Sequence, residues 1–229
     1  MLTQTISRTV PVQPAARAIR TAPPVSPRTS ATTIELMGAP MPFVRDAEIY
    51  GENEPAEYLY KVISGTVRTY KVLNDGRRQI GAFYLPGDVF GLEIGDVHTF
   101  SAEAIADCKV LVIKRSSVMG LASRDSSVAR ELWSMTAGEL QRVQDHILLL
   151  IKTAQERVAG FLLEMAGRSP KSDEISLPMS RQDIADYLGL TIETVSRTLT
   201  QLENSAAIAV PTSRRIVLRN RGALNRMNG

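Results

Sequence analysis

The stretch that decides the fold runs from Ser180 to Glu203 and reads SRQDIADYLGLTIETVSRTLTQLE. Ser180 can cap a helix, and Asp183 stands in the register of a capping box, where Glu or Gln is the commoner partner. Gly189 permits a left-handed turn, and Thr191 can cap a second helix. Apolar residues recur at helical spacing on both sides of this turn, as Ile184, Ala185, Leu188 and then Val195, Leu199, Leu202. The stretch therefore predicts a helix-turn-helix, and its caps and glycine disfavour the alternative of a helical hairpin without function.

The outward face of the second helix carries residue types that can read base edges. Four side chains project near its N-terminal end, where a recognition helix meets DNA: Ile192, Glu193, Ser196 and Arg197. Arg can donate two hydrogen bonds to guanine, Glu can accept one from cytosine N4, and Ser can do either. The alternative to base reading is an i,i+4 ion pair between Glu193 and Arg197 on the helix surface, which stabilises an exposed helix by only a few tenths of a kcal/mol.

Two short β-type runs follow this helix, at residues 208–210 and 215–218, on either side of a turn at 211–214. A pair of strands after a helix-turn-helix predicts a winged helix, with the wing tip placed to touch a phosphate.

The middle of the chain changes to short β-type runs that end at turn residues. These runs lie at 58–63, 66–73, 79–85, 101–106 and 109–113. Asp75 and Gly76 suit the positive φ angles of a hairpin turn. Because no helical pattern intervenes, the region predicts a small all-β barrel or jelly roll rather than a parallel α/β sheet.

Residues 126–152 are helical in period and contain no Pro, with one slip in the apolar pattern around Gly138 and Glu139. About 27 residues make roughly 40 Å of helix, which is longer than a small barrel covers. A partner helix from a second copy explains this length better than a core helix under the barrel. The predicted dimer contacts are Leu132, Met135, Leu140, Val143, Ile147 and Leu150.

Composition and charge limit the classes of protein. The single cysteine, Cys108, excludes an intramolecular disulfide and a Cys-ligated metal site within one chain, and favours a cytoplasmic setting. No apolar run is long enough to span a membrane, and the first twenty residues lack the apolar core of an export signal. Residues 1–34 hold four Arg and no acid, and residues 214–229 hold five Arg and no acid. Basic ends around an acidic middle favour a polyanion as partner.

We therefore predict an α+β chain of four parts. They are a disordered basic arm at 1–34, a jelly-roll-like β-roll at 35–121, a dimerisation helix at 122–152 and a winged helix-turn-helix domain at 153–229.

The motifs within this frame resemble those of the FNR branch of the cyclic-AMP receptor protein (CRP) superfamily, and above all its FixK-type regulators. The most specific is Glu193-Thr194-Val195-Ser196-Arg197. The stretch 51–60, Ser64-Gly65 and Pro86-Gly87-Asp88 are similar to the family's cyclic-nucleotide-binding-like β-roll, and 156–159 to the helix before the DNA-binding domain.

The resemblance implies a sequence-specific transcription activator that binds double-stranded DNA as a homodimer and recruits RNA polymerase. Glu193, Ser196 and Arg197 would read a palindromic TTGA-type site, and Ile192 stands where cyclic-AMP receptor proteins carry an Arg. The phosphate contacts carried over from the family are Ser180, Arg181, Gln182, Thr191, Thr194, Ser213 and Arg214.

The family's cofactors are not expected. Phe100 and Ser101 replace the Arg-Ser pair that holds a cyclic phosphate, and the arm lacks the Cys group of an iron–sulfur cluster. A haem would have only His98 and His146 as ligands, and we expect the latter to be packed or solvated. Cys108 is expected to be a small buried hydrophobe. The FixK resemblance implies activity without an effector, metal or other cofactor.

Three alternatives remain. One is a CRP-like sensor with an unidentified ligand in the β-roll, and another is a repressor with the same fold. An enzyme of the cupin type is disfavoured, because two separated His residues cannot supply a metal cluster.

Overall fold

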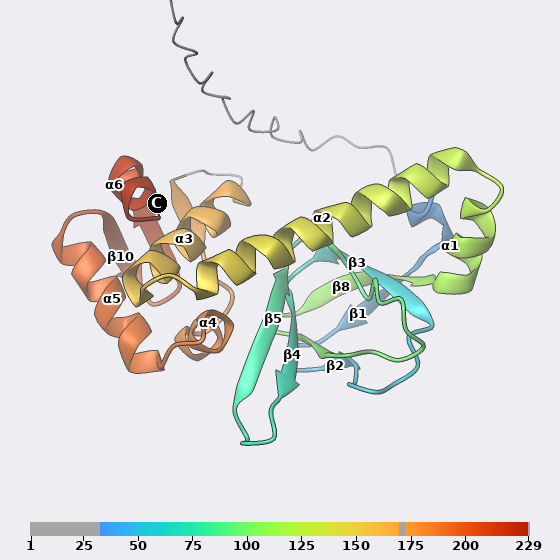
Figure 1. Ribbon diagram of the computed structural model, residues 1–229, viewed down its shortest axis with the longest axis horizontal. Helices are drawn as coiled ribbons and strands as arrows, with labels where there is room; N and C mark the ends of the chain where they lie inside the picture. Colours follow the sequence, from blue (N-terminus) through green and yellow to red (C-terminus); the bar gives the residue numbers. More distant parts are fainter. Residues whose placement is uncertain (1–32, 170–172, 229) are drawn as a thin grey trace, which may run out of the picture. The chain divides into compact units, whose positions relative to one another are not determined.

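The computed structural model describes residues 33–169 and 173–228 (Figure 1). The predicted disordered arm at 1–34 lies outside the described residues except for its last two positions. Of these, Ile34 is only 1% exposed and packs with Leu59, Ile113, Val118 and Val128. Ile34 therefore belongs to the folded core, although its sequence context assigned it to the arm.

The first folded part is a roll of two antiparallel sheets that follows the short 3-10 helix η1 (Glu35–Met37). One sheet has the order β1-β8-β3-β6 and the other β2-β7-β4-β5 (Figure 1). The strands are β1 (Ala39–Phe43), β2 (Glu48–Tyr50), β3 (Tyr58–Ser64), β4 (Val67–Val72), β5 (Arg78–Tyr84), β6 (Val89–Phe90), β7 (Ser101–Ala104) and β8 (Cys108–Lys114). The five predicted strands and the turn at Gly76, whose φ is +83°, are confirmed, whereas β1, β2 and β6 are too short or too irregular in pattern to be seen in the sequence.

Two helices follow β8, namely α1 (Arg115–Ala122) and the long helix α2 (Ser126–Leu150). The Asp125 side chain caps α2 by accepting a hydrogen bond from Ser127 N. The predicted long helix is confirmed to within two residues. Only Val128 and Leu149 of its 25 residues are buried, so much of the surface of α2 is left exposed by the part of the chain that the structure describes.

The last part is a winged helix. It contains α3 (Ala154–Gly167), β9 (Glu174–Ser176), α4 (Arg181–Leu188), α5 (Ile192–Asn204), β10 (Ile208–Thr212), β11 (Arg215–Leu218) and α6 (Arg221–Asn228), with the sheet order β10-β11-β9. The two predicted wing strands are confirmed, and β9 and α6 are additions.

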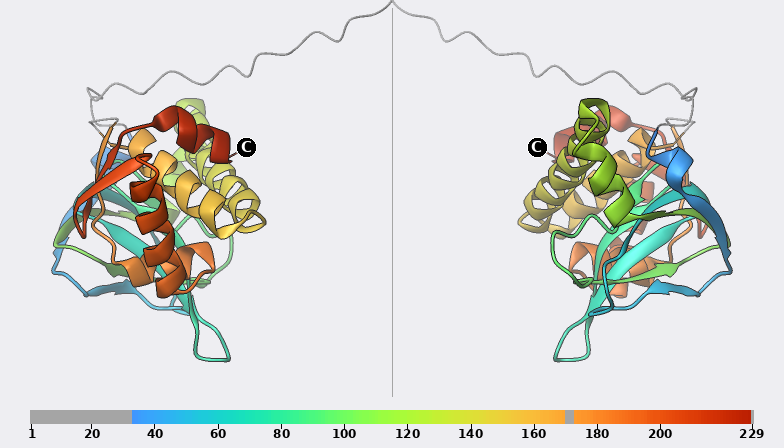
Figure 2. Two further views of the ribbon diagram at one scale, coloured as in Figure 1. Left: turned by 90° about the vertical axis from the view of Figure 1, so that its left-hand side faces the viewer. Right: turned by 90° about the vertical axis from the view of Figure 1, so that its right-hand side faces the viewer.

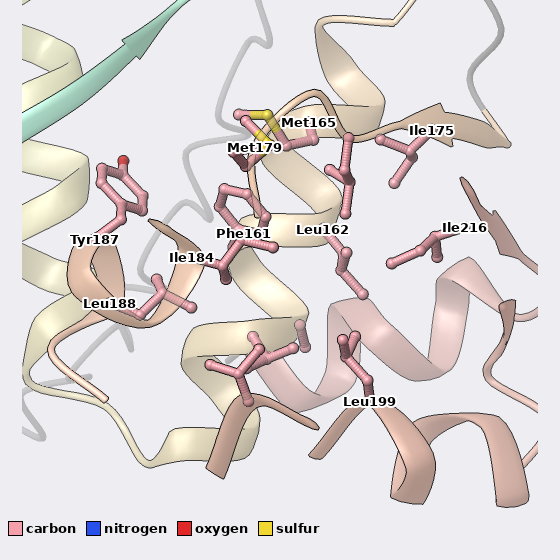
Figure 3. Close-up of a cluster of buried hydrophobic side chains, with 14 of the residues drawn as sticks. Phe161, Leu162, Met165, Ile175, Met179, Ile184, Tyr187, Leu188, Leu199 and Ile216 are labelled. Carbon is pink, nitrogen blue, oxygen red and sulfur yellow. The ribbon is translucent and has the colours of Figure 1, made fainter. Parts of the chain in front are cut away.

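The core of the winged helix is built from the apolar stripes that the sequence indicated. Figure 3 shows Phe161 of α3 on the side of Ile184 of α4, and Leu162 of α3 on the side of Ile216 of β11 and Leu199 of α5. Each fully buried side chain of this size contributes about 1.5–3 kcal/mol relative to an exposed one. These stripes fix α5 by its inner face and leave its outer face free.

Candidate nucleic-acid interface

Local capping and one glycine orient α4 and α5. The Ser180 hydroxyl accepts from Asp183 N, and the Asp183 carboxylate accepts from Ser180 N, so the capping box is complete. Gly189 ends α4 with φ at +61°, a left-handed conformation that a residue with a Cβ adopts only at a cost. The Thr191 hydroxyl accepts from Thr194 N and caps α5. The helix-turn-helix predicted from residues 180–203 is therefore confirmed in its caps, turn and buried face.

The predicted base-reading residues lie together on the uncovered side of α5. Glu193 and Arg197 are exposed, Ile192 is 37% exposed, and Ser196 is half-buried between them and α4. The left view of Figure 2 shows α5 on the face turned to the viewer, with no other element in front of it. Four adjacent side chains with donor, acceptor and apolar character are thus presented outward from the N-terminal half of one helix.

Glu193 is prepared to act as an acceptor. Its pKa is lowered by hydrogen bonds from its own backbone N–H and the Thr191 side chain, and to a smaller extent by the charge of Arg197. Among the ion pairs of the described residues, none joins Glu193 to Arg197. The two side chains thus interact through charge without a direct bridge, and Arg197 stays exposed at the surface.

A contact between α4 and α5 was not foreseen from the sequence. Arg181 Nη1 donates a hydrogen bond to Ser196 Oγ at 3.3 Å, which links a predicted phosphate contact to a predicted base contact.

The predicted phosphate contacts differ in what they can still donate. Both the N–H and the hydroxyl of Ser180 donate to Asp183 Oδ2, at 2.9 and 2.8 Å, so Ser180 has no donor left for a phosphate. Gln182 donates one amide hydrogen to Asp186 Oδ1 and keeps the other. Ser180 is therefore structural, whereas Gln182 retains a free donor.

The remaining phosphate candidates lie at the start of α5 and on the wing. The hydroxyls of Thr191 and Thr194 lie 3.1 Å apart at the helix N-terminus, where the helix dipole favours an anion. Ser213 and Arg214 are exposed between β10 and β11. Arg215 next to them pairs with Glu174 at 2.7 Å and is a structural cation.

Asp183 is also the centre of a buried ion-pair network that sequence reasoning missed. Its Oδ1 accepts from Arg68 of β4 at 2.8 Å and from Arg78 of β5 at 2.6 Å. Arg68 further pairs with Glu103 at 3.0 Å, and Arg78 with Asp186 at 2.7 Å. The network joins the first helix of the helix-turn-helix to the β4–β5 hairpin, and only the unusual choice of Asp at the capping position hinted at it.

The exposed side of α2 carries an apolar seam that contains three of the six predicted dimer contacts. Leu140, Val143 and Ile147 are 57%, 46% and 56% exposed, as a surface awaiting a partner would be. Leu132 and Met135 instead pack against the core of their own chain. Trp133, which is 76% exposed, stands seven residues before Leu140 and extends the same seam. The helix therefore carries an inward stripe and an outward stripe, and both continue past Gly138, since Trp133 before it is exposed and Leu149 after it is buried.

A cavity of about 450 Å³ lies between the β-roll and α2. Tyr50, Phe100 and Glu93 line it from the roll, and His146 and Leu150 line it from α2. Three predicted dimer contacts, Val143, Ile147 and Leu150, line this cavity, and Val143 and Ile147 are at the same time exposed on the seam. No Lys or Arg lines the cavity in the part of the chain that the structure describes, and two carboxylates do, so it suits a cyclic phosphate poorly.

The cysteine and both histidines pack against other side chains of the chain. Cys108 is buried, and burial raises the pKa of its thiol, which confirms the small buried hydrophobe. His98 lies in a loop, is 1% exposed and stacks on Tyr50. His146 stacks on Tyr187, and burial lowers the pKa of its imidazole. In the described residues no helix has the length and apolar character to cross a membrane.

Comparisons with known proteins agree with this architecture. Residues 40–125 match the cyclic nucleotide-binding domain, and residues 156–227 match the Crp-like helix-turn-helix domain. The chain is 52% identical to the nitrogen fixation regulation protein FixK of Azorhizobium caulinodans, over 86% of this chain and 82% of that protein. It is 42% identical to the protein of the same name from Rhizobium meliloti, over 74% and 77%. The structure of FixK2 from Bradyrhizobium japonicum is 56% identical, with a TM-score of 0.81 over 84% of this chain and 98% of that one.

Proposed function

Because this chain belongs to the CRP/FNR family of DNA-binding transcription regulators, with FixK proteins among its relatives, we propose that it is an activator that binds a palindromic TTGA-type site as a homodimer. It recruits RNA polymerase to the promoter and does so without a small-molecule effector. The observation that carries this proposal is the exposed group of Ile192, Glu193, Ser196 and Arg197 on a capped recognition helix.

The mechanism follows from a symmetric pair of chains. The exposed seam of α2, with Leu140 and Ile147 at seven-residue spacing, supports pairing with the same helix of a second copy. Two α5 helices then enter successive major grooves about one helical turn apart. Gln182, Thr191, Thr194, Ser213 and Arg214 hold the backbone, and affinity falls with salt by a log–log slope of roughly −0.9 per neutralised phosphate.

The primary test is selection of bound sequences from random DNA, with and without added cyclic nucleotides. The proposal requires a palindromic TTGA-type consensus that is the same under both conditions. Transcription in vitro from a promoter with that site then separates activator from repressor, because an activator raises the yield of transcript. Recovery of no consensus, or lower transcription on addition of the protein, contradicts the proposal.

The second candidate is the effector-dependent sensor, and the cavity beside Tyr50 and Phe100 is the observation that favours it. A DNA-binding affinity that rises on adding a small molecule would support this sensor. The acidic lining makes an uncharged or cationic molecule a better candidate than a cyclic nucleotide.

Arg197→Ala is expected to cost about 1–3 kcal/mol of specific binding and to relax the preference at one guanine of each half-site. The reason is that only a bidentate guanidinium matches guanine O6 and N7 together. Fluorescence anisotropy on matched and mismatched duplexes measures both effects. Arg226→Ala removes the same charge from the exposed surface of α6 and leaves the preference intact. If Arg226→Ala lost as much specific binding free energy as Arg197→Ala, the proposed contact of Arg197 with guanine would be refuted.

Ile192→Arg is expected to shift the preferred half-site toward that of the cyclic-AMP receptor branch, because it adds donors at a position where the present side chain can only touch a thymine methyl. Selection from random DNA with the variant reads the shift directly. Ile192→Ala is the control, since it removes the methyl contact without adding a donor. An unchanged consensus in Ile192→Arg would mean that this side chain lies outside the groove.

A further inference from the structure

We propose that Arg181 is a specificity-positioning residue, which fixes the direction of the Ser196 hydroxyl so that Ser196 reads a hydrogen-bond acceptor and rejects cytosine. The inference rests on the proposed function, because it assumes that α5 lies in the major groove. It starts from the contact of Arg181 Nη1 with Ser196 Oγ at 3.3 Å.

A freely rotating serine hydroxyl does not favour one base over another. It has one O–H donor and two acceptor lone pairs, and its hydrogen rotates to suit its surroundings. A free Ser196 could therefore accept from cytosine N4 or adenine N6 as readily as it donates to thymine O4 or a purine N7.

Arg181 removes this ambiguity. A guanidinium only donates, so Ser196 Oγ must be the acceptor in their hydrogen bond. The cation beside Oγ also opposes the approach of a second donor, such as the amino group of a base. Ser196 thus keeps its hydroxyl hydrogen and one lone pair, and the adjacent charge favours the hydrogen as the outward contact.

The hydroxyl hydrogen has no competing acceptor within the helix. A serine in a helix often donates to the carbonyl four residues earlier, here that of Ile192. Among the hydrogen bonds of the described residues, the one made by Ser196 Oγ is that from Arg181, while the Ser196 carbonyl accepts from Thr200 Oγ1 at 3.1 Å. The donor thus remains free for a base.

The position of both residues makes the contact persistent. Arg181 is the first residue of α4 and Ser196 lies one turn into α5, and the buried faces of these helices hold them together at Ala185 and Val195, each 0% exposed. Arg181 and Ser196 are themselves half-buried. The guanidinium uses one of its five donors for Ser196 and keeps others for the DNA backbone. One side chain can therefore hold a phosphate, which fixes the position of the protein on the DNA, and at the same time orient a base-reading residue.

Thymine, guanine and adenine each present an acceptor in the major groove, whereas cytosine presents only its amino donor. The expected pattern is therefore exclusion of cytosine at the base facing Ser196. This exclusion should be lost when Arg181 is lost, without any change at the bases facing Glu193 and Arg197.

The test compares selected sequences and affinities for the wild type, Arg181→Met, Ser196→Ala and the double variant Arg181→Met/Ser196→Ala. Arg181→Met keeps the apolar stem and removes every donor. We expect it to reduce discrimination against cytosine at that one base roughly fivefold, the ratio that corresponds to one hydrogen bond. The double variant should show the same discrimination at that base as Ser196→Ala alone, because Arg181 acts there through Ser196.

Arg214→Met is the matched control, since it removes the same charge from the exposed wing tip without touching α5. It should weaken binding to all sequences equally and leave every base preference unchanged. The melting temperature of each free protein confirms that the fold is intact.

Two outcomes would overturn the inference and are distinguishable. If Arg181→Met behaves like Arg214→Met while Arg197→Ala still relaxes its guanine, Arg181 is a phosphate contact only and the proposed function stands. If Arg197→Ala also leaves all preferences unchanged, the assignment of α5 to the groove fails and this inference fails with it.

Discussion

Replacing Leu140 and Ile147 of α2 by glutamate is expected to leave the chain monomeric in sedimentation. Both side chains are more than half exposed and lie seven residues apart on the same outward stripe. In a paired helix they would meet their own copies, so four carboxylates would be brought together in an apolar seam. The monomer should retain its winged helix but bind a palindrome about a hundredfold or more weakly, because it loses the gain from two linked half-sites.

Met119→Glu is the matched control, because Met119 is 55% exposed on α1 and lies off the seam. It should sediment as a dimer and bind DNA like the wild type. The chain has one tryptophan, Trp133, and the structure exposes 76% of it on the seam. Its fluorescence should therefore shift to shorter wavelength as the concentration is raised through the dimer range. An intact dimer in the double variant would place the contact elsewhere on the chain.

Asp183→Asn is expected to lower the free energy of unfolding by about 1.5–3 kcal/mol, the usual cost of losing hydrogen bonds to a charged group, because Arg68 keeps Glu103 and Arg78 keeps Asp186 as partners. The Asp183 side chain is 7% exposed, and its Oδ1 is the shared acceptor of Arg68 and Arg78. Without the charge of Asp183, each guanidinium would keep one carboxylate partner, Glu103 or Asp186, and would lose its second. The amide that replaces the carboxylate also has an NH₂ group. If the amide were flipped, this group would face the N–H and O–H donors of Ser180 and could not accept from them.

Urea denaturation measures this loss, and Asp145→Asn provides the comparison. Asp145 is an exposed acid of α2 that accepts from Gln141 at 2.8 Å, so its substitution should change stability by less than about 0.5 kcal/mol. The single variant Arg78→Met and the double variant Arg78→Met/Asp183→Asn complete a cycle, in which the double loss should be smaller than the sum of the single losses. Additive losses would indicate that Arg78 and Asp183 do not interact.

The sequence predicted best what is decided locally. The caps Ser180 and Thr191, the turn at Gly189 and the apolar stripe through Val195 act over three or four residues, so their consequences can be worked out along the chain. The same holds for the outward placement of Glu193 and Arg197, because the positions opposite a buried stripe must face away from it.

Contacts between distant segments could not be predicted from local sequence patterns. Leu132 and Trp133 are neighbours in an apolar helix, and helical period alone does not say which of two stripes the β-roll of the same chain will cover. Asp183 completes the capping box although Glu or Gln is the commoner residue there, and the same carboxylate also accepts from Arg68 and Arg78, more than a hundred residues away. The Arg181–Ser196 bond likewise arises from the packing of α4 on α5.

The residues from Ser180 to Glu203 thus determined by themselves that the chain carries a helix-turn-helix and which of its side chains face outward, because hydrogen bonds within a helix and its caps are short-range in sequence. Only the tertiary structure decided that Asp183 is buried, which apolar stripe of α2 stays exposed, and that the Ser196 hydroxyl accepts from Arg181. The reason is that burial depends on segments that the chain brings together only when it folds.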